Sequence, residues 1–181
     1  MRLMAKLFGI FLVLAGFSMP SFAAGHNDTQ SFGFTGLGYY EMSDFESLYV
    51  GFPASNFKTS GAGFQVYYEH GVMDNLTLSV ALGYARLLSS NQFDTQVSEN
   101  FFIGDILASY YFRDASTVVQ PYLAGGGGVI VSGRGAAPTL DLGGGVHFKV
   151  ADNVSLRLQV LYKTAIIHHR GEGSFGVAFH F

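Results

Sequence analysis

Charged and histidine side chains recur at alternate positions of segments that are otherwise apolar or small, so a sheet would gather them on one face. Carboxylates, imidazoles and cations brought together in this way could act as a catalytic or ion-conducting site. The alternative is a network of salt bridges, because charges in a low-dielectric interior must be paired to be tolerated. The near balance of acids and bases favours the network. Its predicted members are Glu69, Asp105, Asp141, His147, Lys149, Arg157, Lys163 and His180.

A second group of reactive residues lies in the stretch QVLYKTAIIHHRGEG and just after it. His168 and His169 precede Glu172 and Ser174, so a base, an acid and a hydroxyl fall within seven residues. Surface loops often collect polar residues, and adjacent histidines diverge on a strand, which weakens a shared metal site. We place His168, His169 and Glu172 in a loop, with Ser174 just beyond it, and predict no catalytic residue, no metal site and no cofactor.

β-Strands are the elements predicted to position these side chains, because apolar residues alternate with polar or small ones along most of the chain. In residues 153–165, Val154, Leu156, Leu158, Val160 and Tyr162 alternate with Ser155, Arg157, Gln159, Leu161 and Lys163. Single-chain bacterial barrels have an even number of strands. The pattern predicts eight strands, over residues 32–41, 60–70, 75–88, 100–112, 118–131, 139–150, 153–165 and 173–181.

The predicted connections alternate in length. Short turns with Asp, Asn or Gly are expected at 71–74, 113–117 and 151–152. Longer loops are expected at 42–59, 89–99, 132–138 and 166–172. Short turns at one end and long loops at the other are typical of outer-membrane barrels.

The residue types on the two faces indicate which face lies inside. The non-apolar face consists mostly of Gly, Ser, Ala and Thr, which fit the crowded lumen of an eight-stranded barrel. Only 13% of the residues are charged, against about 25% in typical soluble domains. A soluble barrel would need a charged exterior, so the sequence predicts that the apolar face is the outer one. The predicted fold is an all-β, eight-stranded antiparallel up-and-down transmembrane β-barrel.

The first 23 residues have the organisation of a signal peptide. Arg2 and Lys6 precede an apolar run that is too short to span a bilayer, and Ser21-Phe22-Ala23 is a small-x-small cleavage motif. We expect cleavage after Ala23 or Ala24, so that residues 1–23 are the signal peptide and 24–181 the barrel domain. The full chain has 13 acidic and 10 basic residues, which gives no support for a nucleic-acid partner.

The last nine residues, GSFGVAFHF, place Phe175, Val177, Phe179 and Phe181 on one face of a strand. This pattern resembles the C-terminal signature of outer-membrane barrels, which ends in an aromatic residue, and Val177, Phe179 and Phe181 match it. The resemblance implies that the barrel assembly machinery recognises these residues. The whole predicted domain resembles the small eight-stranded family of OmpA transmembrane domains, OmpX and OmpW.

The resemblance implies a protein of the cell outer membrane that contacts outer-membrane lipid and lipopolysaccharide. We expect a structural or surface-interaction role without catalysis. The apolar residues in 42–59 either bind a surface ligand or extend the flanking strands. Two alternatives stay open. One is a narrow OmpW-like channel for small apolar molecules. The other is a lipid A-modifying hydrolase, although the His-x-Ser pair of the lipid A deacylase family is missing from the aligned stretch.

Overall fold

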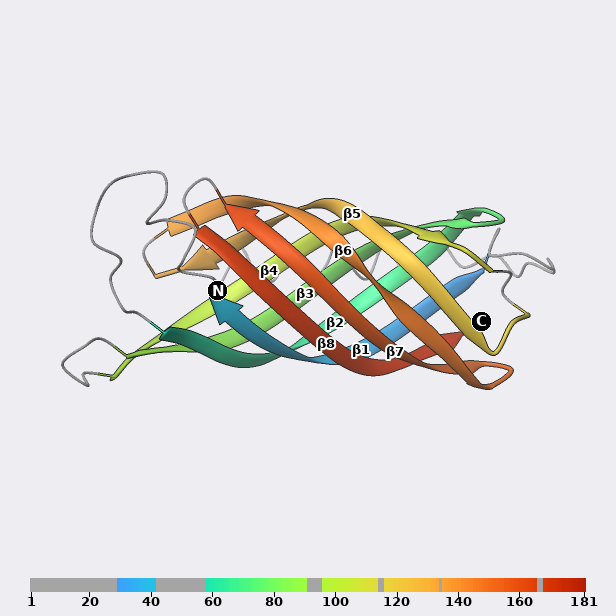
Figure 1. The fold of residues 1–181 in the computed structure, drawn as a ribbon, viewed down its shortest axis with the longest axis horizontal. Coiled ribbons are helices and arrows are strands. Elements are labelled where there is room, and N and C mark those ends of the chain that lie inside the picture. The colour runs from blue at the N-terminus through green and yellow to red at the C-terminus, as the bar shows by residue number, and fades with distance from the viewer. Residues whose placement is uncertain (1–28, 42–57, 91–95, 114–115, 134, 166–167) are drawn as a thin grey trace.

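The eight predicted strands form and close into one barrel. The computed structural model describes residues 29–41, 58–90, 96–113, 116–133, 135–165 and 168–181. Neighbouring strands are antiparallel, and β1 also pairs with β8, so the sheet has no free edge (Figure 1). The strands are β1 (Gln30–Glu41), β2 (Lys58–Met73), β3 (Leu76–Ser90), β4 (Gln96–Tyr111), β5 (Val119–Ser132), β6 (Gly135–Ala151), β7 (Val154–Ala165) and β8 (His168–His180).

Some sequence predictions lie outside these residues. The predicted signal peptide, 1–23, and most of the predicted first loop, 42–59, are not among the described ranges. Within the described part of the chain, no helix is long and apolar enough to cross a membrane.

The last strand closes the barrel, as predicted. Ser31 of β1 pairs with His180 of β8, and the pairing continues without interruption to Glu41 and Arg170. Beyond the strand, the backbone N–H of Phe181 donates to the carbonyl of Gln30 at 3.0 Å. The C-terminal residue is therefore tied to the first strand.

The strands are longer than predicted at the long-loop end. Residues predicted as the loops 132–138 and 166–172 are mostly in strands, because β6 begins at Gly135 and β8 begins at His168. Apolar alternation stops where the outer wall leaves lipid, whereas the backbone ladder continues as long as a neighbouring strand is present. A prediction based on alternation therefore ends each strand too early.

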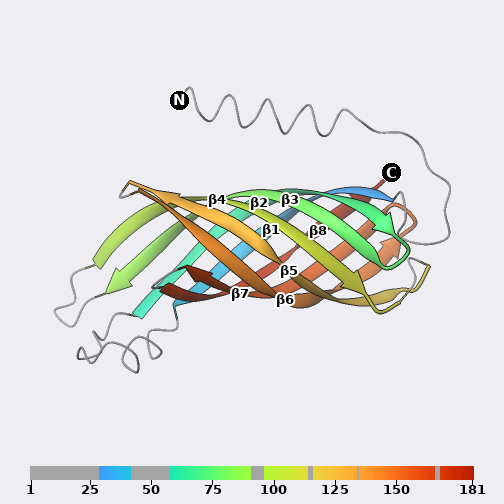
Figure 2. The ribbon, with the colours of Figure 1, turned by 90° about the horizontal axis from the view of Figure 1, so that it is seen from above.

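The opposite end of the barrel carries the short turns. Asp74–Asn75 and Asp152–Asn153 are two-residue turns, and residues 112–118 join β4 to β5. The start of β1 and the end of β8 lie at this same end, on the right in Figure 1, and Figure 2 shows the tilt of the strands from a second direction. We call the two ends of the molecule the short-turn end and the long-loop end.

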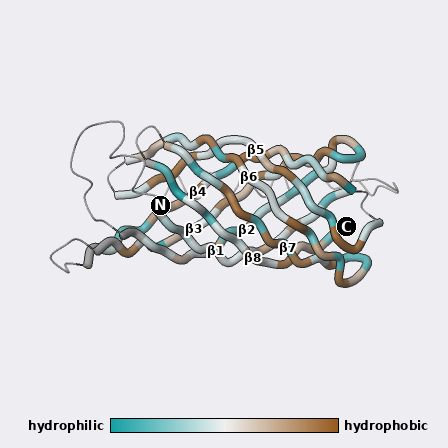
Figure 3. Tube along the Cα trace, in the orientation of Figure 1, coloured by the Kyte–Doolittle hydropathy of each residue, from teal (hydrophilic) through white to brown (hydrophobic). Residues whose placement is uncertain are grey.

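The outer wall is apolar, which confirms the predicted orientation of the two faces. Leu140, Leu142, Ile106 and Val160 are each at least 63% exposed, and they come from three different strands. Between them along each strand lie the residues that point inward, and Figure 3 shows hydrophobic and hydrophilic residues alternating along the tube. An apolar surface of this extent is far larger than the patches that soluble monomers expose, and a closed barrel can place it in lipid.

Aromatic side chains gather toward both ends of the outer wall, as in the girdles of transmembrane barrels. Toward the long-loop end, Tyr84 contacts Phe64 and Phe102, with ring centroids 6.0 Å and 5.4 Å apart. Toward the short-turn end, Tyr110 contacts Phe112, with ring centroids 5.6 Å apart. The wall between these two groups is the lipid-facing band.

We predict that the junction of β1 and β8 depends on Gly176. A Cβ on the buried Gly176 would overlap the carbonyl oxygen of Phe34 and the side chain of Thr35. Gly176→Ala should therefore lower barrel stability by about 1–3 kcal/mol through overpacking. Gly173→Ala, three residues away on the exposed face, is the matched control, since nothing lies within 4 Å of its added Cβ. Urea unfolding of both refolded proteins measures the effect. Equal unfolding midpoints would contradict the close packing of Gly176 against β1.

Candidate functional site in the barrel lumen

An arginine and three tyrosines fill the part of the lumen nearer the short-turn end. Arg157 of β7 lies 3.6 Å from Glu69 of β2, measured from Nη1 to Oε2, and its Nε donates to the hydroxyl of Tyr122 at 3.0 Å. Tyr111 donates its hydroxyl to the other oxygen of Glu69 at 2.7 Å. The guanidinium also lies 4.3 Å from the ring centroid of Tyr67. We call this group the Arg157 layer. All of its members are buried, so the charges are satisfied by one another rather than by water.

Histidines extend the Arg157 layer toward the short-turn end. The buried ring of His147 meets the rings of Tyr111 and Tyr122 edge-on, with centroids 5.6 Å and 5.4 Å away. His180 follows, with its ring 6.5 Å from that of His147 and a ring nitrogen 2.8 Å from the hydroxyl of Ser155. The aromatic packing of this region therefore places both imidazoles inside the barrel, with their ring planes tilted by 54° to one another.

Lys149 differs from the other predicted members of the network. Its ammonium lies 3.5 Å from the carboxylate of Asp152, which is a fully exposed turn residue, and the Lys149 side chain is itself 32% exposed. The structure therefore places Lys149 at the rim of the short-turn end, whereas Glu69, Asp105, Asp141, His147, Arg157 and Lys163 are buried.

Three carboxylates surround a single ammonium group in the middle of the lumen. Nζ of Lys163 lies 2.6 Å from Asp105, 3.2 Å from Asp141 and 3.4 Å from Glu172, and each of these side chains is at most 1% exposed. Gln65 donates to the same oxygen of Asp105 at 3.0 Å. Four strands contribute the charged groups, which we call the Lys163 layer. One cation thus holds three acids, so the predicted balance of charges does not hold within this layer.

Glu172 is a member that the sequence analysis missed. The sequence pattern predicts it in the loop 166–172, but it lies in β8 with its side chain buried beside Lys163. The outward positions of this part of β8 are His169, Gly171 and Gly173, so no apolar stripe reveals the strand. The available signal was parity, because Glu172 is an even number of residues from Ser174 and His180, on the face that points inward.

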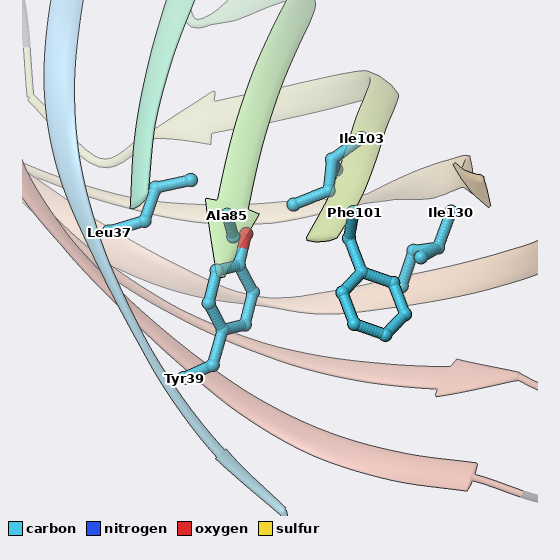
Figure 4. Close-up of a cluster of buried hydrophobic side chains, with 6 residues drawn as sticks. All are labelled: Leu37, Tyr39, Ala85, Phe101, Ile103 and Ile130. Carbon is cyan, nitrogen blue, oxygen red and sulfur yellow. The ribbon is translucent and has the colours of Figure 1, made fainter. Parts of the chain in front are cut away.

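An apolar cluster crosses the lumen nearer the long-loop end. Figure 4 shows the six side chains pointing toward one another from β1, β3, β4 and β5. Above it, the guanidinium of Arg170 lies 5.1 Å from the ring centroid of Phe101. Along β4, Tyr111, Asp105 and Phe101 belong to the Arg157 layer, the Lys163 layer and this cluster, in that order. The members of the apolar cluster are Leu37, Tyr39, Ala85, Phe101, Ile103 and Ile130.

Of the possible base, acid and hydroxyl in the C-terminal region, the described side chains His169, Glu172 and Ser174 do not meet. The ring of His169 stacks on Tyr162, with centroids 5.7 Å apart, and its Nδ1 lies 2.6 Å from the Tyr162 hydroxyl in an exposed pair. Glu172 and Ser174 are buried inside the barrel. The wall separates the imidazole of His169 from the other two groups, and this gives no support to a hydrolase that uses His169 as its base; the side chain of His168 lies outside the described ones. Nor do the described residues include three His, Cys, Asp or Glu side chains arranged to hold a metal ion.

Comparisons with known proteins identify the fold. No family model and no curated protein matches the sequence. Neisserial surface protein A is 19% identical, with a TM-score of 0.61, over 88% of this chain and 100% of that one. OprG from Pseudomonas aeruginosa is 10% identical, with a TM-score of 0.61, over 87% and 98%. Ail of Yersinia pestis, in complex with the heparin analogue sucrose octasulfate, is 16% identical, with a TM-score of 0.57, over 86% and 99%.

These similarities extend along nearly the whole of each solved chain, and the strand number, the closure and the apolar outer wall agree with them. The chain has the fold of the small eight-stranded outer-membrane β-barrels.

Proposed function

We propose that this protein is an integral protein of the bacterial outer membrane with a structural or surface-interaction role and without catalytic activity. The observation that carries the proposal is a lumen occupied in succession by the Arg157 layer, the Lys163 layer and the apolar cluster. Residues 1–23 are proposed to be a cleaved signal peptide, which leaves 24–181 as a single barrel domain.

The packing of the lumen argues against free passage of ions. An ion would have to separate Arg157 from Glu69 and Lys163 from its three carboxylates, all of which are buried. Removing one partner of a buried pair costs about 3–5 kcal/mol. The ion would then have to pass the apolar cluster without its water. Both barriers favour a barrel whose lumen does not conduct ions.

Interactions are therefore assigned to the outside of the barrel. The exposed Phe179 and Phe181, with the half-buried Val177, are proposed to face lipid and to be recognised by the barrel assembly machinery. Lipopolysaccharide and other outer-membrane lipids would surround the wall. The neighbour Ail was solved with a heparin analogue, and residues 42–59 are the segment proposed here to contact a surface ligand.

A narrow channel for small apolar molecules is the second candidate. The apolar cluster favours it, because Leu37, Phe101, Ile103 and Ile130 line the lumen near the long-loop end. The buried ion pairs below this cluster oppose it, since an apolar solute could pass only by separating them.

Planar-bilayer recording distinguishes the closed barrel from a channel. We expect the refolded full-length protein to insert without producing stepwise conductance, because paired charges and apolar side chains occupy the lumen. Folding of the same sample is verified by heat-modifiable gel mobility, and heat-denatured protein is the control. Reproducible conductance steps that depend on the folded protein would contradict the closed lumen.

A further inference from the structure

One polar area interrupts the outer wall immediately beyond the aromatic contacts at the long-loop end. Arg86 of β3 lies between Ala62 of β2 and Asn100 of β4, which are its Cα partners on the two neighbouring strands. Ser60 and Ser98 lie two residues further along β2 and β4, and all five residues are exposed. We call this area the Arg86 patch.

The Arg86 patch lies at the calculated edge of the lipid-facing band. Phe64, Tyr84 and Phe102 form the row of partners two residues closer to the short-turn end. From Leu76, the first residue of β3, ten steps lead to Arg86. At about 3.3 Å per residue and a tilt of about 40°, this strand segment covers about 25 Å along the membrane normal. That is the approximate height of the apolar band of an outer-membrane barrel, so Arg86 lies where lipid phosphates begin.

The chemistry of the patch suits an anion. A guanidinium has five N–H groups in a planar fork that matches phosphate. Nη2 of Arg86 donates to the hydroxyl of Ser98 at 3.1 Å, which holds the side chain along the wall. The amide of Asn100 lies on the neighbouring strand at the same level. On the described outward positions of β2, β3 and β4, no Asp or Glu is present to repel an anion.

We propose that the Arg86 patch binds a phosphate group on the headgroup of a phosphorylated glycolipid in the outer leaflet. The proposal rests on the outer-membrane location proposed above and names the lipid chemistry that this part of the wall recognises. Arg86 would bind the phosphate through charge-assisted hydrogen bonds, and the Ser98 and Asn100 side chains would add neutral ones.

The position of the patch favours a lipid over a free ion. A solvent-exposed arginine holds an isolated phosphate ion only weakly, because water and salt screen the charge. A lipid is already held in the band by its acyl chains, and the rings of Phe64, Tyr84 and Phe102 lie directly below Arg86. The phosphate then meets Arg86 at a high local concentration.

The test measures binding of bisphosphorylated lipid A, and of the same lipid without its phosphates, to the refolded full-length protein in detergent by native mass spectrometry. We expect wild-type protein to prefer the phosphorylated lipid about tenfold, as charge-assisted hydrogen bonds to phosphate imply. Arg86→Gln should lose most of this preference. Arg113→Gln is the matched control and should keep it, because Arg113 is also exposed but lies in the connection at the short-turn end.

Several outcomes would overturn the proposal. An Arg86→Gln protein with the wild-type lipid preference would exclude Arg86 as the phosphate ligand. Displacement of lipid A by inorganic phosphate at equal concentration would show a site for the free ion instead. The proposed function has a separate readout, the heat-modifiable barrel in outer-membrane fractions. If wild-type protein is missing there, both proposals fail, whereas normal insertion with unchanged lipid preference overturns this one alone.

Discussion

Replacing Lys163 with methionine is expected to destabilise the barrel by about 3–5 kcal/mol, since a buried charged group that loses its partner remains uncompensated. Lys163 is the ion-pair partner of Asp105, Asp141 and Glu172, and all four side chains are at most 1% exposed. One oxygen each of Asp105 and Asp141 has no hydrogen-bond partner among the described residues. Methionine preserves most of the volume of the lysine side chain but removes the ammonium that pairs with the three acids.

The matched control is Lys149→Met. Lys149 pairs with the fully exposed Asp152 at the rim, so its loss should change stability little. Unfolding by guanidinium chloride in detergent micelles measures both variants against wild type. Equal midpoints for the two variants would show that the Lys163 layer does not support the barrel.

A double variant separates the charge effect from simple loss of packing. Lys163→Met combined with Asp105→Asn removes one of the stranded charges, the one that lies 2.6 Å from the ammonium in the wild type. The double variant should therefore be more stable than Lys163→Met alone. A lower stability of the double variant would indicate that the hydrogen bond from Gln65 to the Asp105 carboxylate matters more than the removal of the carboxylate's charge.

Leu158→Lys is the second substitution for which we expect a large effect, about 2–4 kcal/mol, because it places an ammonium in the middle of the hydrocarbon layer. Leu158 is 48% exposed on the outer wall and lies midway between Val154 and Tyr162, the first and last outward residues of the apolar stripe on β7. The lysine cannot reach water from this depth without distorting the bilayer.

Val154→Lys is the control at the edge of the same stripe, next to the Asp152–Asn153 turn. There the lysine can extend into the interfacial region, and the expected cost is about 0–1 kcal/mol. Folding titrations in phospholipid vesicles measure the two costs. An equal cost at both positions would mean that this wall does not span a bilayer, and would remove the physical basis for the membrane location.

The local alternation of apolar and polar residues predicts most of the fold. Leu156, Leu158 and Val160 alternate with Arg157 and Gln159. Because lipid and lumen are such different environments, the leucines and the valine can only face lipid and the polar residues can only face the lumen. The even number of strands and the apolar C-terminal strand then implied closure. The same reasoning failed from Gly135 to Pro138 and from His168 to Glu172, where strands continue beyond the lipid and alternation no longer reports them.

The sequence by itself thus determined the barrel, the outward apolar stripe and the inward direction of Arg157, Lys163 and their candidate partners. Only the tertiary structure decided which groups meet. Lys163 of β7 pairs with Asp105 of β4 across the lumen. It also pairs with Glu172, which lies in a part of β8 that has no apolar pattern. Alternation specifies the face of a residue, whereas contact across the lumen depends on the tilt of the strands and on the register of every pair between them.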